Sequence, residues 1–312
     1  MGEELTPRGG GGSAAAWAAL QQAPNMGPAT MLRLARVFGS PEGALGASAD
    51  ELVARGRLTT KQAEAIRWQG ETRSAIEREI EDWRARGIGL VAMGEGAYPP
   101  GLADLRTPPP LLYVRGSLRP EDGRAVAIVG TRSPDRRGSS LARQLGRELA
   151  NRGFAVVSGL ARGIDTAAHR GALQVARGRT IAVLGCGLLR VYPPENGVLA
   201  KSIAERGCLI SEVPPDTEVA AKYLLMRDRI QAALSRAVIV VQAHGECGSI
   251  VTARHAVRCG RLLYGVPWET PPFSEGWRTL RSLGARPITA ETDLDEVARE
   301  TDAHEGRQRG LM

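Results

Sequence analysis

The chain has 312 residues, of which 43% are hydrophobic and 24% are charged, and its formal net charge is +7. Such a composition excludes a largely disordered chain, and no run of about 18 apolar residues occurs that could cross a membrane. The first residues, Met1-Gly2-Glu3-Glu4, are acidic where a signal peptide is basic, so we expect a cytoplasmic protein.

The basic charge is concentrated in the middle of the chain. Residues 121–290 carry 24 basic and 14 acidic side chains, whereas 1–120 carry 14 and 13, and 291–312 carry 3 and 7. A basic domain favours a polyanionic ligand. Nearly all the cations are arginine, which suits phosphate contacts, although a GC-rich genome would produce the same excess.

The N-terminal part reads as a glycine-rich segment followed by helices. Residues 1–13 are predicted to be disordered, and residues 14–90 are predicted to form a small helical domain. Short helices joined by a glycine-containing turn are typical of helix-hairpin-helix or SAM-like nucleic-acid modules, but a helical domain without a ligand fits the near-zero local charge equally well. The expected helices are Ala14–Gln22, Ala29–Phe38, Ala49–Arg55, Thr60–Gln69 and Thr72–Gly87.

A proline-rich connector, 91–123, leads into alternating strands and helices over 124–290. Short apolar strands separated by single helices predict an α/β fold, namely a Rossmann-like doubly wound, mostly parallel sheet. The acidic tail, 291–312, is expected to hold one short helix at 293–300 and a frayed end, with no room for a winged-helix domain. The expected strands are Ala125–Val129, Ala155–Val157, Thr180–Leu184, Leu209–Ser211, Ala237–Val241 and Leu262–Val266.

Glycine-rich turns follow most of these strands. They include Gly130-Thr131-Arg132, the loop Ser158-Gly159-Leu160-Ala161-Arg162-Gly163, and Gly248-Ser249, which opens a helix with Thr252 on it. Ligands of open parallel sheets bind at the carboxyl ends of the strands, and helix N-termini offer free N–H groups to anions. The pattern predicts an anion-binding edge; the alternative is that the glycines only tighten the turns.

The sequence lacks the motifs of several enzyme classes. There is no G-x-G-x-x-G dinucleotide fingerprint, no Walker loop and no nucleophile elbow. Asp165 and His169 are spaced for an acid–base dyad, but a helix-capping aspartate with a packed histidine explains them as well. The four cysteines form no C-x-x-C pair and have no histidines at ligand spacing, so we predict reduced thiols, no metal and no cofactor.

The segment 222–229 combines cations with an aromatic ring. Lys222, Tyr223, Arg227 and Arg229 together suit contact with a nucleic-acid backbone and stacking of bases. The alternative is a solvated basic helix start in which Asp228 pairs locally.

Five ordered blocks resemble the DNA-processing protein A family (DprA, also called Smf). The blocks run from Tyr98-Pro99 to Thr252-Ala253, and the run Ser-Gly-Leu-Ala-Arg-Gly-Ile-Asp at 158–165 is highly specific. The resemblance implies a non-enzymatic homodimer that binds single-stranded DNA and loads the RecA recombinase in DNA-mediated transformation (competence). By the resemblance, Gly130, Thr131, Arg132, Ser158, Gly159, Arg162, Gly163, Gly248, Ser249 and Thr252 line the DNA pocket. With Lys222, Tyr223, Arg227 and Arg229 of the segment above, they make up the predicted DNA-binding residues.

This chain departs from the family's pattern at one corner of the implied pocket. The family usually has Arg-Asn-Arg preceded by an aromatic residue, whereas here Asp228 and Leu224 take those places. Two other functions on the same fold remain open. One is a nucleotide-binding sensor; the other is a nucleoside-monophosphate phosphoribohydrolase of the LOG type, although Val251 and Thr252 stand where that enzyme has its acidic residue.

Overall fold

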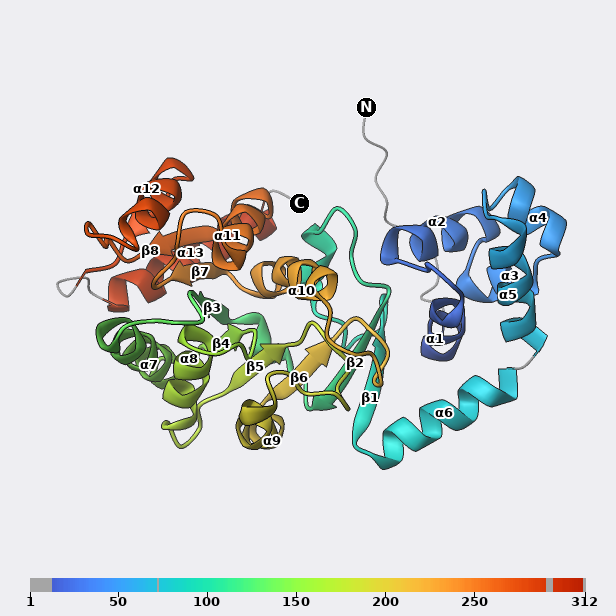
Figure 1. The fold of residues 1–312 in the computed structure, drawn as a ribbon, viewed down its shortest axis with the longest axis horizontal. Coiled ribbons are helices and arrows are strands. Elements are labelled where there is room, and N and C mark those ends of the chain that lie inside the picture. The colour runs from blue at the N-terminus through green and yellow to red at the C-terminus, as the bar shows by residue number, and fades with distance from the viewer. Residues whose placement is uncertain (1–12, 72, 290–293, 311–312) are drawn as a thin grey trace. The chain divides into compact units, whose positions relative to one another are not determined.

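The computed structural model describes residues 13–71, 73–289 and 294–310 (Figure 1). Apart from Ser13, the segment predicted to be disordered lies outside the described residues. The chain divides into two compact units, Met1–Tyr98 with Arg106–Val114, and Pro99–Leu105 with Arg115–Met312. None of the helices in the described ranges combines the length and the apolar character that a bilayer crossing demands.

The first unit is mainly helical, as its sequence predicts. Serines start several helices: the Ser13 hydroxyl accepts from the Ala16 N–H at 3.2 Å, and Ser48 forms a capping box with Glu51. Trp17, Leu20 and Met31 fill the core. The helices are α1 (Ala14–Gln22), α2 (Pro28–Phe38), α3 (Pro41–Gly46), α4 (Ala49–Ala54), α5 (Thr60–Glu71) and α6 (Arg73–Ala85).

The predicted connector is more ordered than a linker. Strands β1 (Ile88–Ala92) and β2 (Leu111–Gly116) are neighbours in a sheet, and 3₁₀ turns form at Pro100–Asp104 and Pro120–Gly123. The Tyr113 side chain is buried, packs edge-on against Trp83 and donates its hydroxyl to Gln21 at 3.0 Å.

The second unit contains the predicted doubly wound parallel sheet. Its strands lie in the order β6-β5-β4-β3-β7-β8-β9, and every pair is parallel. The predicted strand ends agree with the structure to within a residue, and β9 is additional. The strands are β3 (Ala125–Val129), β4 (Ala155–Ser158), β5 (Thr180–Val183), β6 (Cys208–Ser211), β7 (Ala237–Val240), β8 (Leu262–Gly265) and β9 (Arg286–Pro287).

Helices cover both faces of this sheet (Figure 1). Successive strands are added toward one side from β3 to β6 and toward the other side from β7 onward, so the strand order switches between β3 and β7. α7 (Arg136–Asn151), α8 (Ile164–Leu173) and α9 (Gly197–Arg206) connect the strands from β3 to β6 on one face. α10 (Ala221–Leu234) and α11 (Gly248–Arg258) lie on the other face, where α12 (Ser274–Ser282) packs against α11. This change in strand order is the topological switch point, where such sheets bind ligands.

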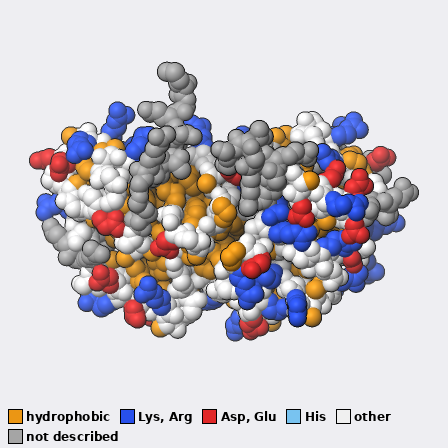
Figure 2. All heavy atoms as spheres, turned by 180° about the vertical axis from the view of Figure 1, so that it is seen from behind, with side chains coloured by type: hydrophobic (Ala, Val, Ile, Leu, Met, Phe, Trp, Pro, Cys, Tyr) orange, Lys and Arg blue, Asp and Glu red, His pale blue; other side chains and the backbone are white. Residues whose placement is uncertain are grey.

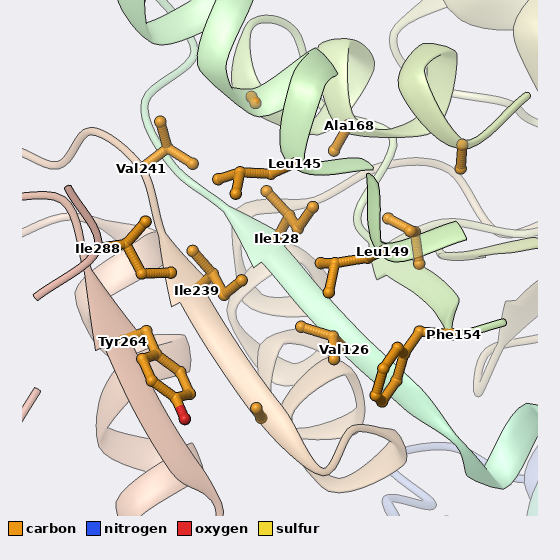
Figure 3. Close-up of a cluster of buried hydrophobic side chains, with 14 of the residues drawn as sticks. Val126, Ile128, Leu145, Leu149, Phe154, Ala168, Ile239, Val241, Tyr264 and Ile288 are labelled. Atoms are coloured by element: carbon orange, nitrogen blue, oxygen red, sulfur yellow. The ribbon is translucent and has the colours of Figure 1, made fainter. Parts of the chain in front are cut away.

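The core lies between the sheet and the α7–α8 layer (Figure 3). Val126 and Ile128 of β3 and Ile239 of β7 point toward Leu145 and Leu149 of α7 in that view. Because the strands are buried on both faces, they read as continuous apolar runs rather than alternating ones. For this reason the strands could be predicted closely from the sequence.

The acidic tail is more ordered than its sequence predicts. A single helix, α13, runs from Leu294 to Gly310 rather than fraying after residue 300. Val297 and Ala298 join the core, and the Asp302 carboxylate accepts from Arg124 at 2.9 Å and from Arg236 at 2.7 Å. The tail's acidic charge therefore partly neutralises arginines of the domain instead of extending into solvent.

α7 and α8 approach closely because glycines lie where they meet. A Cβ atom on Gly146 of α7 would collide with the backbone oxygen of Ala168, and one on Gly171 of α8 would collide with that of Arg143. Backbone atoms cannot move aside as a flexible side chain can, so each site requires the smallest residue.

We expect Gly146→Ala to lower the free energy of unfolding by about 1–3 kcal/mol, because the added methyl group forces the two helices apart. Urea unfolding followed by circular dichroism measures this change. Gly197→Ala is the matched control, since no atom lies within 4 Å of a Cβ there and alanine restricts the unfolded chain. An equal loss in both variants would contradict the packing argument.

Candidate nucleic-acid interface

The parallel sheet brings the predicted glycine turns to one edge. β3, β4, β5 and β7 all end there, and backbone hydrogen bonds tie their loops together. The Thr131 N–H donates to the Gln242 carbonyl at 2.7 Å, and the Ile164 N–H donates to the Thr131 carbonyl at 3.2 Å. The loop after β3 is thus fixed between the loop after β7 and the start of α8, at the switch point.

Three helices begin at this edge without a side-chain cap. α8, α10 and α11 have Gly163, Ala220 and Cys247 at their N-caps, and none of these side chains accepts a helix N–H. Gly163 has φ +78°, which other residues adopt only with strain. At the start of α8 the Ile164 and Thr166 N–H groups donate to the Thr131 and Ala161 carbonyls, both at 3.2 Å. The N-termini of all three helices still carry partial positive charge, so the edge is suited to anions.

The hydroxyl groups predicted to line the pocket are engaged within the protein. The Ser158 hydroxyl donates to the Ile128 carbonyl at 2.6 Å, and the Thr252 hydroxyl donates to the Gly248 carbonyl at 3.2 Å. The Thr131 hydroxyl accepts from the Ser133 N–H at 3.2 Å, and the Ser249 hydroxyl lies 3.0 Å from the Cys247 thiol. These side chains shape the loops, and the backbone presents the free donors.

The two arginines of the edge loops differ in their partners. Arg132 is exposed, and no residue in the described ranges forms an ion pair with it. Arg162 is half-exposed and forms an ion pair with Glu195. Figure 2 shows that Lys and Arg side chains lie among Asp and Glu side chains over the face that it draws, as Arg162 lies beside Glu195. Arg132 is therefore the arginine of these loops that can take a phosphate without first losing a carboxylate partner.

Arg227 lies inside the protein rather than on the surface, with 6% of its area exposed. Its guanidinium donates to the Val183 carbonyl at 3.0 Å and lies 3.1 Å from Asp228 and 3.9 Å from Asp165. A Cβ on Gly159 would overlap that guanidinium, which is a requirement for glycine that the sequence analysis did not foresee. Arg227 thus holds α10 to the ends of β4 and β5.

Asp165 and Asp228 share this one arginine. Asp165 also accepts from the Gly159 and Ala161 N–H groups, at 3.1 and 3.3 Å. Burial raises the pKa of the Asp228 carboxyl to about 7; Arg227 and Arg132 oppose the shift, and Asp165 adds to it. Burial also raises the pKa of the Asp165 carboxyl, a shift that Arg227 and these N–H groups oppose.

The rest of the segment 222–229 is divided between the surface and the interior. The Lys222 ammonium lies 4.7 Å from the centre of the Tyr223 ring, and Lys222 is exposed while Tyr223 is half-buried. The Arg229 guanidinium forms an ion pair with the buried Glu212. Of the four predicted contact residues, Lys222 and Tyr223 can reach a ligand directly, and Arg227 and Arg229 are structural in this state.

Asp165 and His169 do not form an acid–base dyad. The His169 ring nitrogen Nδ1 lies 2.7 Å from the Thr180 hydroxyl, and burial lowers the pKa of His169 to about 3. Asn196, which the sequence analysis did not single out, donates to the Leu160 carbonyl and the Thr166 hydroxyl, both at 2.9 Å. Within the described ranges, no cluster of His, Cys, Asp and Glu could hold a metal ion.

Comparisons with known proteins agree with the resemblance. The family model described as DNA recombination-mediator protein A matches residues 89–299. The DNA processing protein DprA of Bacillus subtilis is 36% identical over 223 residues, which are 71% of this chain and 75% of that protein. Protein Smf of Synechocystis is 36% identical over 284 residues, which are 89% of this chain and 71% of that protein.

Two solved structures are also similar to this one. The X-ray structure of DNA processing protein A from Streptococcus pneumoniae has a TM-score of 0.77 at 26% identity, over 89% of this chain and 95% of that chain. DNA processing protein A from Helicobacter pylori, described with a unique single-stranded DNA binding mode, has a TM-score of 0.61 at 31% identity, over 68% and 94%.

We expect Asp228→Asn to gain stability relative to the wild type as the pH rises from about 5 to 7. The folded-state pKa of Asp228 is about 7 and that of an unfolded aspartate is near 3.9, so the folded state binds the proton more tightly. The protonated Asp228 therefore adds to the free energy of unfolding at low pH, and this contribution falls by up to about 1.4 kcal/mol per pH unit as the pH approaches 7. Asparagine does not titrate, so the variant does not lose stability in this way. Urea unfolding of both proteins across this range measures it; parallel curves would mean that Asp228 is ionised throughout.

Proposed function

Because the chain belongs to the DNA recombination-mediator protein A family, we propose that it binds single-stranded DNA at the carboxyl edge of the parallel sheet. The observation that carries this proposal is the convergence of three uncapped helix N-termini on one edge beside Arg132. Such an edge offers several donors to phosphates that lie in a row, as they do in a nucleic-acid strand.

The DNA strand is held mainly through its sugar–phosphate backbone. N–H groups at the start of α11 donate to phosphate oxygens, and Arg132 supplies a bidentate cation. Lys222 adds a second charge, and the exposed part of the Tyr223 ring offers a surface on which a base stacks. None of these contacts reads a base edge, so binding depends on salt and shows little sequence preference.

The remaining predicted contacts act by position or become available after rearrangement. Gly130, Gly159 and Gly163 let the loops pass close to one another, and the hydroxyls of Thr131, Ser158 and Thr252 fix them. Arg162 joins the phosphate contacts once it leaves Glu195, an exposed ion pair that costs little to break. Arg227 and Arg229 hold α10 in place.

Asp228 limits the binding at neutral and higher pH. Its carboxylate lies under the start of α11, 3.5 Å from where a Cβ on Gly248 would be, and opposes a phosphate there when it is ionised. Protonation at lower pH removes that opposition. Burial, which favours the neutral acid, makes the residue compatible with an anion site.

The most direct test measures single-strand affinity by fluorescence anisotropy at two or more ionic strengths. Arg132→Ala is expected to weaken binding to all sequences about equally and to reduce the slope of log K against log salt by about one. Arg281→Ala, which removes an exposed arginine of α12, is the control and should leave both values nearly unchanged.

An unchanged salt slope in Arg132→Ala would contradict a phosphate contact by this residue. Two further outcomes would point to other functions of the same edge. Tight binding of a mononucleotide without DNA affinity would indicate a sensor, and release of free base from AMP would indicate a phosphoribohydrolase.

We also propose that the protein acts in the cytoplasm as a homodimer that passes the bound strand to the RecA recombinase during DNA-mediated transformation. The family's description as a recombination mediator supports this role. The wild type is expected to speed RecA filament formation on DNA coated with single-strand-binding protein, whereas Arg132→Ala is not. A RecA ATP-hydrolysis assay measures the rate, and equal acceleration by both proteins would separate RecA loading from this site.

A further inference from the structure

A group of arginines lies on the outer surface of α7 and α8. Arg136, Arg137 and Arg143 lie on α7, Arg170 lies on α8, and Arg177 lies in the turn that follows α8. All five are exposed, and none of their side chains forms an ion pair or a hydrogen bond with any residue that the structure describes. These five residues are called the α7–α8 arginines below.

Helix geometry brings these arginines onto one continuous surface. Positions 136 and 143 are seven residues apart and so share one face of α7, opposite the buried Leu145 and Leu149. Gly171 packs directly against the Arg143 backbone, which sets Arg170 of α8 beside Arg143 of α7. Figure 1 shows the two helices side by side.

Acidic residues do not neutralise this surface. Residues 133–178 contain eight arginines but only three acidic residues, and each acid is engaged elsewhere. Asp135 caps α7 by accepting from the Gly138 N–H at 2.7 Å, Glu148 pairs with Arg147 and Arg152, and Asp165 is buried beside Arg227. Like charges held this close repel one another, and a polyanion would relieve that repulsion.

The surface is continuous with the edge already described. α7 begins four residues after Arg132, and α8 begins directly after Gly163, so both helices lead away from the edge. From Arg136 to Arg143 the helix advances about 10 Å. No aromatic side chain is exposed there, because the one aromatic residue of 136–178, Phe154, is buried. The surface therefore suits a phosphate backbone rather than bases.

We propose that the α7–α8 arginines form a second contact for single-stranded DNA, over which the strand continues after it leaves the carboxyl edge. The inference rests on the proposed function of that edge and extends it. The edge holds a short stretch of the strand, and the α7–α8 arginines hold the backbone of the nucleotides that follow, without regard to sequence. Longer strands consequently bind more tightly and with a steeper salt dependence than short ones.

The test compares a short oligothymidylate of about 6 nucleotides with one of about 25, a range that brackets typical site sizes. The triple variant Arg136→Gln/Arg143→Gln/Arg170→Gln is expected to bind the short oligonucleotide like the wild type. For the long one it should lose about tenfold or more in affinity, with a salt slope smaller by about 2, since each lost phosphate contact contributes about 0.7 for single strands.

A matched control removes the same charge from the other side of the sheet. Arg258→Gln/Arg278→Gln/Arg281→Gln changes three exposed arginines of α11 and α12 and should leave the salt slope for the long strand nearly unchanged. Replacing the same three α7–α8 residues by lysine should restore long-strand binding, because lysine keeps the charge. Circular dichroism verifies that all the variants are folded.

The outcomes separate this inference from the proposed function. If the wild type binds the short oligonucleotide but the glutamine variant and the matched control have the same long-strand slope, the second contact is wrong and the edge site stands. If the glutamine variant weakens the short and the long strand equally, its effect is general electrostatics and the inference is also overturned. If the wild type binds neither oligonucleotide, the proposed function itself fails.

Discussion

The candidate site depends on one buried guanidinium, that of Arg227. It joins α10 to the end of β5 through the Val183 carbonyl and to the start of α8 through Asp165, and it occupies the space above Gly159. Removing one partner from such a buried cluster costs about 3–5 kcal/mol, because it leaves an uncompensated charge. The loops that carry the free backbone donors are held in register by this cluster.

The same cluster explains how an acidic residue can stand in a site for anions. Burial raises the pKa of Asp228 to about 7, the neighbouring Asp165 adds to the rise and Arg227 opposes it, so part of the population is uncharged near neutral pH. Asparagine at this position would be neutral at every pH. The charge of the proposed binding edge therefore changes with pH.

The positive charge of the second unit is not equally available to a ligand. Arg124, Arg162, Arg229 and Arg236 are paired with carboxylates, and those pairs hold the tail helix and the loops in place. Arg132 and the α7–α8 arginines are exposed and form no such pair with any described residue; they begin at the switch point and extend along the helices that start there. An overall charge of +7 therefore says less about binding than the positions of the residues that have no acidic partner.

The sequence by itself determined the sheet, most of its helices and the edge at which the glycine turns meet. Buried parallel strands need continuous apolar runs, and glycines are needed where backbones pass closely, so both leave a local pattern that can be read. The predicted contact residues, however, proved to be of two kinds. The hydroxyls of Ser158 and Thr252 and the guanidinium groups of Arg227 and Arg229 are engaged inside the protein, whereas Arg132 and Lys222 are exposed.

Only the tertiary structure decided that division, and the same holds for the tail. Whether an arginine on α10 faces solvent or the ends of β4 and β5 depends on how the helix is rotated on the sheet, which residues distant in sequence determine together. The local sequence of α13 predicts a polar segment that frays, because its stabilising partners, Arg124 and Arg236, lie far away in the chain. Local pattern specifies which elements form, and long-range packing decides which of their charges remain free to bind a ligand.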